Sequence, residues 1–358
     1  MKVLELISSL NHRAGAEVFV YSLSQAFIKD GICDVKLVSL YSDVDDSFAK
    51  KDGIPVASCK KRKGIDIQAA NRLKKIIKEY KPDVIHMHLN CLLTYYLAFG
   101  FKKHKWEIYQ TIHTIPGKES NLFNNYLRKR YIKKGFYHLV AISKQLAIKM
   151  ASIYKIAPLF VNNGLVLKKP KINPKLVKYD FCIVASFTEA KNHKLLFDAI
   201  EELNNEQECS LLCVGGGPLL ADAKKYIDSK ELSKQVTFIG DVSDVYPYLL
   251  SSKVFVLSSN REGNPISLLE ALDCGLPVVV PNIGGIPDVV DDSNGCIYEV
   301  SNKKALIDGM KRIINLVSKS NIYEATNKER SLSFSIDVTA KSYYMLFLNK
   351  GEKPHDPK

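Results

Sequence analysis

The chain has 358 residues, 46% of them hydrophobic and 25% charged, which suits two globular domains and excludes a disordered or fibrous protein. No apolar run approaches the roughly 20 residues of a membrane-spanning helix, and the first seven residues are too short and too acidic for a signal peptide. The eight cysteines are scattered without the paired spacing of a metal site. We expect a cytoplasmic protein whose cysteines are reduced core residues.

The net charge of +13 is unevenly distributed. Residues 1–165 contain 27 Lys and Arg against 13 Asp and Glu, a net charge of +14, which leaves −1 for the remainder. A one-sided basic surface attracts anionic partners such as membrane head groups or nucleic acid. The basic run 128–134 is interleaved with Tyr126, Tyr131, Phe136 and Tyr137, which favours docking on an anionic membrane, at the inner face of the cell membrane. A solvated face is the alternative, and nucleic acid is not expected to be a partner.

Short apolar runs alternate with longer amphipathic runs in the first half. Strands are predicted at residues 3–8, 35–40, 84–88, 106–113, 139–143 and 160–162, and helices near 16–30, 67–80, 91–102, 121–134 and 144–153. Alternation of strand and helix predicts a parallel sheet covered on both faces.

A linker is predicted around residues 168–175, and a second alternating series follows it. Its strands are expected at 181–186, 210–214, 236–239, 254–257 and 278–280, with helices starting at Asn192, Pro218, Ser243 and Pro265. The fold class is therefore α/β, with doubly wound Rossmann-like domains at 1–165 and 166–335. A final helix at 336–349 is expected to pack on the first domain, and 350–358 to be disordered. Ligands bind at the carboxyl ends of such strands, so two facing domains predict a cleft.

The segment 261–270 holds two carboxylates around the start of a predicted helix. Asn264 is expected to be the N-cap and Pro265 to occupy the first turn, which places Glu262 in the preceding loop and Glu270 in the second turn. Free backbone N–H groups and the helix dipole would bind phosphate between them. This arrangement suits a sugar nucleotide; the alternative is a capped core helix with surface glutamates.

Three further residues stand at the ends of predicted strands. Gly15 opens a helix and would let a phosphate approach its backbone, although turn geometry alone also explains it. Lys191 precedes the predicted N-cap Asn192, where it could neutralise a diphosphate or simply be solvated. His113 ends a strand and could orient a sugar hydroxyl.

Metal and dinucleotide motifs are weak. His86 and His88 alternate on one strand, but no third ligand is evident from the sequence, so they are interpreted as core or cleft residues. Gly215-Gly216-Gly217 lacks the dinucleotide fingerprint and is interpreted as a tight turn near the ligand. The acidic stretch 43–45 is discounted. No metal site is predicted.

Taken together, these segments resemble retaining glycosyltransferase family 4, of GT-B fold. The resemblance rests on residues 236–240, 254–258, 262–270, 271–279 and 284–288, with weaker similarity at 15–17, 82–88 and 163–164. Three positions depart from the family pattern. Ser186 stands where most members have a diphosphate-binding arginine, a contact that Arg261 or Arg13 would have to supply. Ala14 and Asp288 replace the usual glycine and glutamate.

The resemblance implies a role for each site residue. Glu262 would hold the hydroxyls of the donor sugar and Glu270 those of the ribose, with His113 near the transferred sugar. The diphosphate would be held by Lys191, by Gly15 and by the backbone after Gly263. The positions expected to bind the nucleotide sugar are Gly15, Ser186, Lys191, Gly263, Asn264, Pro265, Ile266 and Glu270. The family needs no metal or other cofactor, so Lys191 and the helix dipole would stabilise the departing phosphate.

The resemblance also implies the reaction: transfer with retention from a nucleotide-diphosphate sugar, with UDP commoner than GDP in the family. A lipid-linked or other glycan acceptor of bacterial surface polysaccharide is expected. A sugar-nucleotide 2-epimerase of the same fold and a non-catalytic basic binding protein are the alternatives.

Overall fold

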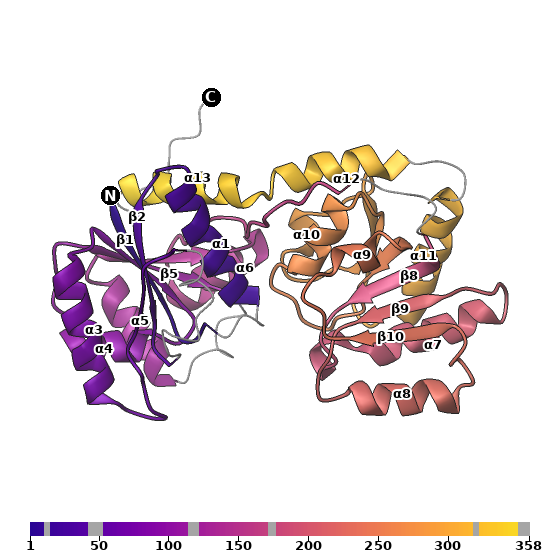
Figure 1. The fold of residues 1–358 in the computed structure, drawn as a ribbon, viewed down its shortest axis with the longest axis horizontal. Coiled ribbons are helices and arrows are strands. Elements are labelled where there is room, and N and C mark those ends of the chain that lie inside the picture. The colour runs from indigo at the N-terminus through magenta and orange to yellow at the C-terminus, as the bar shows by residue number, and fades with distance from the viewer. Residues whose placement is uncertain (11–14, 42–52, 114–121, 171–176, 318–321, 350–358) are drawn as a thin grey trace. The chain divides into compact units, whose positions relative to one another are not determined.

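The computed structural model describes residues 1–10, 15–41, 53–113, 122–170, 177–317 and 322–349. The chain divides into two compact units. The N-terminal unit comprises Met1–Val166 and Ser335–Lys358, and the C-terminal unit comprises Leu167–Phe334. Each unit is built around one parallel sheet, and Figure 1 shows the elements of each.

The N-terminal sheet has the strand order β3-β2-β1-β4-β5-β6-β7, with every pair parallel. Its strands are β1 Lys2–Ile7, β2 Asp34–Ser39, β3 Val56–Ser58, β4 Val84–His88, β5 Glu107–Ile112, β6 Tyr137–Ala141 and β7 Leu159–Phe160. The helices of this unit are α1 Gly15–Lys29, α3 Ile67–Tyr80, α4 Leu92–Phe99, α5 Leu122–Ile132, α6 Lys144–Tyr154 and α13 Ile336–Leu348.

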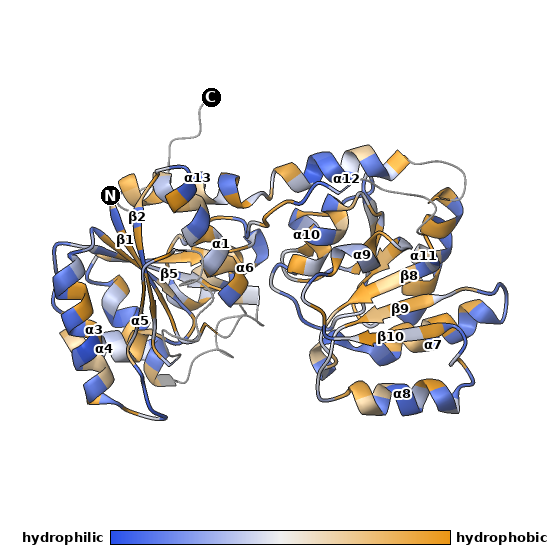
Figure 2. Cartoon of the chain, in the orientation of Figure 1, coloured by the Kyte–Doolittle hydropathy of each residue, from blue (hydrophilic) through white to orange (hydrophobic). Residues whose placement is uncertain are grey.

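Two hydrophobic cores cover the two faces of this sheet, because successive side chains of a strand point to opposite sides. Leu4 and Leu6 of β1 belong to a core with α3, α4, α5 and α6, whereas Val3 and Ile7 join a core with α1 and α13. The strands of each unit are accordingly mostly orange in Figure 2. Helix α13 lies beside α1 (Figure 1), and Tyr109 of β5 donates a hydrogen bond to the carbonyl of Leu346 in α13. The end of the chain therefore completes the core of its beginning.

The C-terminal sheet has the parallel order β10-β9-β8-β11-β12-β13. Its strands are β8 Tyr179–Val184, β9 Leu211–Val214, β10 Val236–Gly240, β11 Ser252–Val256, β12 Val278–Pro281 and β13 Gly295–Tyr298. Its helices are α7 His193–Asn204, α8 Leu220–Ser229, α9 Tyr246–Leu249, α10 Ile266–Asp273, α11 Lys303–Val317 and α12 Ile322–Leu332, with 3-10 turns η2 Glu189–Lys191 and η3 Ile286–Asp288.

The predicted fold class is confirmed: both units are doubly wound, Rossmann-like α/β sheets. The predicted strands and helices all appear, most with ends shifted by one to three residues. The prediction omitted β3, β13, α11 and α12. Both strands are very short, and β13 begins at a glycine that leaves no room for a side chain beside Val278. The tail 350–358 lies outside the described residues.

The expected membrane-docking segment is partly wrong. Arg128, Tyr131, Phe136 and Tyr137 are core residues, each at most 3% exposed, and the Arg128 guanidinium donates to the side chain of Gln110. Periodicity explains the difference, because α5 turns one face into the core while Phe123, Tyr126, Lys129 and Arg130 remain outside. No helix among the described residues is long and apolar enough to span a membrane. All eight cysteines are free thiols, and seven of them are buried.

Candidate active site

The C-terminal unit places its predicted site residues where the order of its strands reverses. Strand β8 lies between β9 and β11, so the loops that follow β8 and β11 leave the sheet edge in opposite directions. Ligands of doubly wound sheets bind at such switch points, beyond the carboxyl ends of the strands. The first loop carries Ser186 and Lys191, and the second carries Glu262, Gly263 and Asn264.

Lys191 and Glu262 are brought together by these two loops. The Lys191 Nζ lies 2.7 Å from Oε1 and 2.8 Å from Oε2 of Glu262. The Ser259 hydroxyl donates to Glu262 Oε1 at 2.6 Å, and the Ser258 hydroxyl donates to the Lys191 carbonyl at 3.0 Å. The Lys191 side chain is 22% exposed and that of Glu262 only 5%. The partly exposed ammonium group of Lys191 is thus paired with the buried carboxylate of Glu262.

Helix α7 begins as predicted. Asn192 is its N-cap and accepts a hydrogen bond from the Leu195 N–H, which places Lys191 directly before the helix.

Helix α10 begins one residue later than predicted, and Asn264 is not its N-cap. The extended backbone of Pro265 makes that residue the cap, and among the described residues no side-chain cap hydrogen bond is made at the start of the helix. Asn264 is 6% exposed, and neither its Oδ1 nor its Nδ2 has a partner among the described residues. Buried amides are normally hydrogen-bonded, so this amide has a donor and an acceptor available for a ligand. The start of α10 and the buried amide together form a candidate anion-binding corner, called the anion-binding corner below.

Gly284 packs closely against the backbone of the loop that carries Glu262. Gly284 has a φ of +61°, and a Cβ on it would lie 2.3 Å from the carbonyl oxygen of Glu262. The N–H of Gly285 donates to the carbonyl of Gly263. The segment before η3 therefore holds the backbone of the Glu262 loop by close approach.

Glu270 lies in the second turn of α10, as predicted. Burial raises the pKa of this carboxyl to about 7, with Asp244 and Asp273 adding to the effect and Lys168 opposing it. This carboxyl is therefore partly protonated near neutral pH, and its ionised form can accept hydrogen bonds from hydroxyl groups. Ser186 is exposed just after β8, and Gly215 packs against this loop, with its Cβ position 2.3 Å from the Ala185 carbonyl oxygen. The three-glycine turn thus borders the loop that was expected to bind the ligand.

The remaining predicted residues belong to the N-terminal unit, whose strand order reverses between β1 and β4. Gly15 is the exposed first residue of α1, the helix that follows β1. His113 directly follows β5 and is 8% exposed, and burial lowers the pKa of its imidazole to about 3.

Residues 11–14 and 43–45, including Arg13 and Ala14, lie outside the described residues. Arg261, the other substitute proposed for the missing arginine, is exposed.

The interpretation of His86 and His88 needs a correction. A third possible metal ligand exists, because Glu5 lies on the neighbouring strand β1, and the ligand atoms of the three residues lie within 4.8 Å of one another. All three side chains are fully buried, so neither histidine is a cleft residue.

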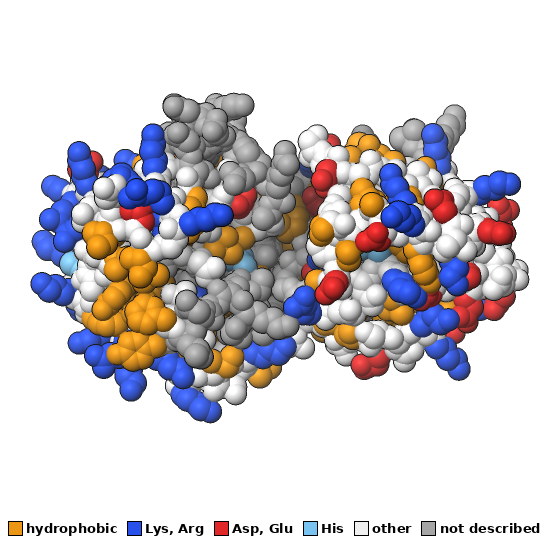
Figure 3. Space-filling view, turned by 90° about the horizontal axis from the view of Figure 1, so that it is seen from below, with side chains coloured by type: hydrophobic (Ala, Val, Ile, Leu, Met, Phe, Trp, Pro, Cys, Tyr) orange, Lys and Arg blue, Asp and Glu red, His pale blue; other side chains and the backbone are white. Residues whose placement is uncertain are grey.

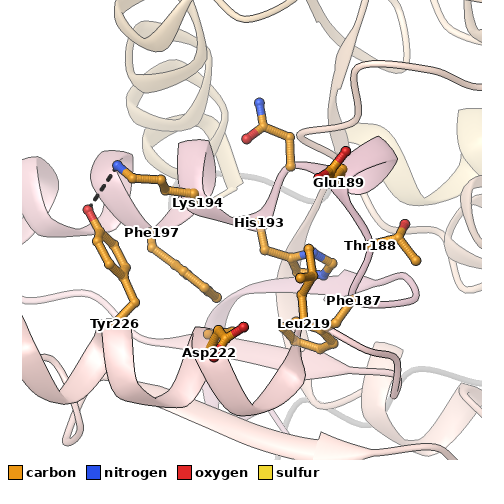
Figure 4. Close-up of a pocket in the computed structure, with 11 residues that line it drawn as sticks. Phe187, Thr188, Glu189, His193, Lys194, Phe197, Leu219, Asp222 and Tyr226 are labelled. Carbon is orange, nitrogen blue, oxygen red and sulfur yellow. Dashed lines mark hydrogen bonds between the residues drawn. The ribbon is translucent and has the colours of Figure 1, made fainter.

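A separate cavity of about 380 Å³ lies between the starts of α7 and α8 (Figure 4). Its lining is mostly apolar, with Phe187 stacked on His193 at 3.9 Å and Leu219 beside them, and Lys194 hydrogen-bonds Tyr226 at its rim. Neither Lys191 nor Glu262 lines this cavity. It is therefore not the anion-binding corner.

Sequence reasoning missed four residues that support these sites: Glu5, Ser258, Ser259 and Gly284. A detectable signal existed for Glu5, a carboxylate within an otherwise apolar strand. The two serines follow β11 after one intervening residue, a position from which a role in the loop could have been inferred. The contact of Gly284 with the Glu262 loop could not, because it joins segments 22 positions apart.

Comparison with known proteins identifies the family of the chain. The family model for glycosyl transferases group 1 matches residues 167–330, and the model for glycosyltransferase family 4 matches residues 13–167. The chain is 21% identical over 297 residues to N-acetyl-alpha-D-glucosaminyl L-malate synthase of Bacillus anthracis, covering 75% of this chain and 77% of the relative. It is 26% identical over 288 residues to UDP-Gal:alpha-D-GlcNAc-diphosphoundecaprenol alpha-1,3-galactosyltransferase of Escherichia coli, covering 71% and 73%.

Among solved structures, Anabaena HepE in complex with UDP has a TM-score of 0.80 at 15% sequence identity, covering 98% of this chain and 100% of HepE. Its fold is that of the present protein. With both halves of the sequence matched by family models, the chain belongs to glycosyltransferase family 4 and is a glycosyltransferase of GT-B fold.

Proposed function

We propose that this glycosyltransferase transfers a sugar from a UDP-sugar to a lipid-linked glycan acceptor, with retention of anomeric configuration, in bacterial surface polysaccharide synthesis. The observation that carries the proposal is the Lys191–Glu262 ion pair beside the uncapped start of α10. This corner offers the partly exposed cation of Lys191, backbone N–H groups and the Asn264 amide to a diphosphate. Glu262 and Glu270 provide acceptors for hydroxyl groups on either side.

The chemistry assigned to these residues is electrostatic. Lys191 moves from Glu262 to the diphosphate when the donor binds, which frees the Glu262 carboxylate to accept hydrogen bonds from the sugar. The acceptor hydroxyl attacks the anomeric carbon on the face from which the bond to the β-phosphate oxygen breaks, and that oxygen takes the hydroxyl proton. Lys191 and the α10 dipole stabilise the charge that develops on the departing UDP. This mechanism requires no metal ion.

The choice of donor and acceptor draws on the similar proteins. The name of the E. coli relative specifies UDP-Gal and a diphosphoundecaprenol-linked acceptor, and the HepE structure contains UDP. A capsular polysaccharide glycosyltransferase of Staphylococcus aureus is also 27% identical over 228 residues, covering 58% of this chain and 62% of that protein. An undecaprenyl-linked acceptor would require the enzyme to work at the inner face of the cell membrane.

An exposed aromatic patch on the N-terminal unit supports membrane docking. Tyr96, Phe101, Phe123 and Tyr126 are neighbours through ring contacts of 4.9 to 6.4 Å, and the Arg130 guanidinium lies over Phe101 and Tyr126. Phe123 is 46% and Tyr126 52% exposed. Figure 3 shows hydrophobic side chains gathered among lysines and arginines on this unit. Aromatic rings surrounded by cations are typical of proteins that bind anionic bilayers.

The test is a panel of UDP- and GDP-sugars incubated with undecaprenyl diphosphate N-acetylglucosamine, with EDTA present in one series. We expect one UDP-sugar to be consumed, with a glycolipid formed in equal amount and no effect of EDTA. Formation of an epimeric nucleotide sugar without glycolipid would instead identify an epimerase. Failure of every nucleotide sugar to bind the parent protein would refute the proposed function.

A further inference from the structure

An apolar groove of about 810 Å³ lies between α6 and α13 of the N-terminal unit, both labelled in Figure 1. It is lined by the first turns of α6, by the outermost strand β7 with its flanking residues, and by one face of α13. Four large apolar side chains in it remain 37 to 70% exposed: Ile148, Phe160, Val338 and Met345. Exposed apolar side chains gathered in one hollow indicate a binding surface.

The walls of this groove are held in place by hydrogen bonds within the unit. Ser143 caps the start of α6 with its side chain. At the start of α13, the Ile336 N–H donates to the Leu165 carbonyl at 2.8 Å. One turn later, the Thr339 hydroxyl donates to the Asn162 carbonyl at 3.1 Å. The groove is therefore already formed in the ligand-free protein, as small-molecule sites usually are.

The charged side chains that line the groove are both cations. Lys144 is the first residue of α6, Lys341 lies in α13, and both are exposed. No Asp or Glu lines the groove in the part of the chain that the structure describes. The dipole of α6 adds positive potential at the end where Lys144 stands. The groove is thus complementary to an apolar chain that carries an anionic head group.

Both lysines stand near the carboxyl edge of the N-terminal sheet. Lys144 opens the helix that follows β6, and Lys341 lies two residues after Thr339, which is bonded to the segment after β7. The same edge carries Gly15 after β1 and His113 after β5. Strand β7 is two strands away from β5, which is about 10 Å at the usual strand spacing. One sugar and a diphosphate can bridge this distance.

We propose that the groove binds the lipid chain of the acceptor, with the diphosphate of the acceptor held by Lys144 and Lys341. This inference rests on the proposed function, because a lipid-linked acceptor supplies both the apolar chain and the anion. The chain then lies along β7 between α6 and α13, and the sugar that is to be extended points along the carboxyl edge toward His113. The enzyme therefore recognises the carrier of the acceptor as well as its sugar.

Two other occupants fit the groove less well. Strand β7 has two residues and is preceded by Pro158, which has no N–H, so it offers little edge to an added peptide strand. A second copy of the chain, docked through the same groove by a two-fold axis, would bring the cations of both copies together.

The test is isothermal titration calorimetry of full-length protein with geranylgeranyl diphosphate below its micelle concentration. We expect binding, and binding at least about tenfold weaker for dimethylallyl diphosphate, which has the same head group on a single isoprene unit. No binding of geranylgeranyl diphosphate would overturn the proposal. Tighter binding of oleoyl lysophosphatidate would also overturn it, because the groove would then belong to a membrane phospholipid. Nucleotide sugar is absent, so a failure here is distinguishable from a failure of the proposed transfer reaction.

A first pair of variants tests where the chain binds. Ile148→Ala, Met345→Ala should weaken binding of geranylgeranyl diphosphate about tenfold, because apolar contact is lost. Phe123→Ala, Tyr126→Ala, on the aromatic patch, should leave it unchanged. All four side chains are exposed, so both variants should fold. Equal losses in the two variants would refute the assignment to the groove. So would a dimer of the parent, seen in sedimentation velocity, that dissociates in Ile148→Ala, Met345→Ala, since a second copy would then cover the groove.

A second pair of variants tests the head group. Lys144→Ala, Lys341→Ala should weaken binding of geranylgeranyl diphosphate about tenfold or more, because charge-assisted hydrogen bonds are lost. Lys78→Ala, Lys149→Ala removes the same charge from exposed positions that do not line the groove, and should weaken binding less. Equal losses in this pair would mean that the protein attracts the diphosphate only through its overall charge, against the proposal.

Discussion

The Lys191 Nζ lies 2.7 Å from one carboxylate oxygen of Glu262 and 2.8 Å from the other, so these two residues neutralise each other. In the proposed reaction they have different partners, the diphosphate for Lys191 and the donor sugar for Glu262. Donor binding is therefore an exchange of one ion pair for another. This exchange leads to different predictions for the two residues.

Lys191→Ala should weaken UDP binding by about tenfold to a hundredfold, because charge-assisted hydrogen bonds contribute about 1.5–3 kcal/mol. The measurement is isothermal titration calorimetry with UDP. Lys194→Ala is the matched control, since this exposed lysine pairs with Asp198 rather than with the Glu262 loop. Equal losses in the two variants would mean that Lys191 contributes only general positive charge.

Glu262→Gln and Glu270→Gln should separate turnover from nucleotide affinity. Glu270→Gln should weaken UDP and UDP-sugar alike by about tenfold, because a carboxylate that accepts hydroxyl groups is lost. Glu262→Gln frees Lys191 for the phosphate and should leave UDP affinity at least as strong, while kcat falls by about tenfold or more. Calorimetry with UDP and steady-state kinetics with the UDP-sugar test the pair. Weaker UDP binding in Glu262→Gln would contradict the assignment.

UDP affinity should rise with pH because the pKa of Glu270 is raised to about 7. The ionised carboxylate accepts the ribose hydroxyls, and its fraction grows from about one tenth at pH 6 to about nine tenths at pH 8. The association constant of the parent should therefore increase by up to about ninefold relative to that of Glu270→Gln over this range. Dividing the association constant of the parent by that of Glu270→Gln cancels the effect of the protonation of UDP itself. A constant ratio would show that the ionisation of Glu270 is not coupled to binding.

Gly284→Ala should destabilise the C-terminal unit and loosen the Glu262 loop, because the new Cβ would lie 2.3 Å from the Glu262 carbonyl oxygen. Gly240→Ala is the control for backbone strain alone, since Gly240 also has a positive φ, of +84°, but has open space around its Cβ position. Strain of this kind costs about 1–2 kcal/mol. The melting temperature should fall more in Gly284→Ala, which alone should also bind UDP more weakly. Equal effects would rule out the contact with the loop.

Membrane binding should depend on the aromatic patch. The double variant Phe123→Ala, Tyr126→Ala should bind less to phosphatidylglycerol vesicles in a sedimentation assay, because two exposed rings and their contact with Arg130 are lost. Ile148 and Met345 are exposed on the same unit, 70% and 46%, and their double alanine variant is the control. The reverse ranking of the two variants would assign docking to the groove between α6 and α13, which these two residues line.

Local pattern was sufficient to predict the two sheets and much of the candidate site. Lys191 was predicted before α7 because Asn192 is a typical cap residue, and Glu270 was predicted in the second turn of α10 because Pro265 is typical of a first helical turn. Asn264 was assigned to the wrong role. A cap and an unpartnered buried amide look the same in sequence, and only the extended backbone of Pro265 distinguishes them.

Contacts between distant segments could not be predicted. The basic and aromatic run 128–137 looked like one surface, but the α5 helix and the strand after it place half of those side chains in the core. The partner of His86 and His88 was Glu5, more than 80 positions away on an adjacent strand. Strand neighbours are set by the topology of the whole sheet, which no single motif encodes.

Helix α13 has a consequence for synthesis on the ribosome. Tyr343 and Phe347 close the core over Glu5 and its histidines, and Tyr109 is hydrogen-bonded to Leu346. The N-terminal unit therefore lacks part of its core until residues 336–348 have been translated, although its strands emerge first. The C-terminal unit has all of its strands and helices within residues 167–334 and can fold earlier. A premature stop before Ile336 would damage the half of the protein that had already been made.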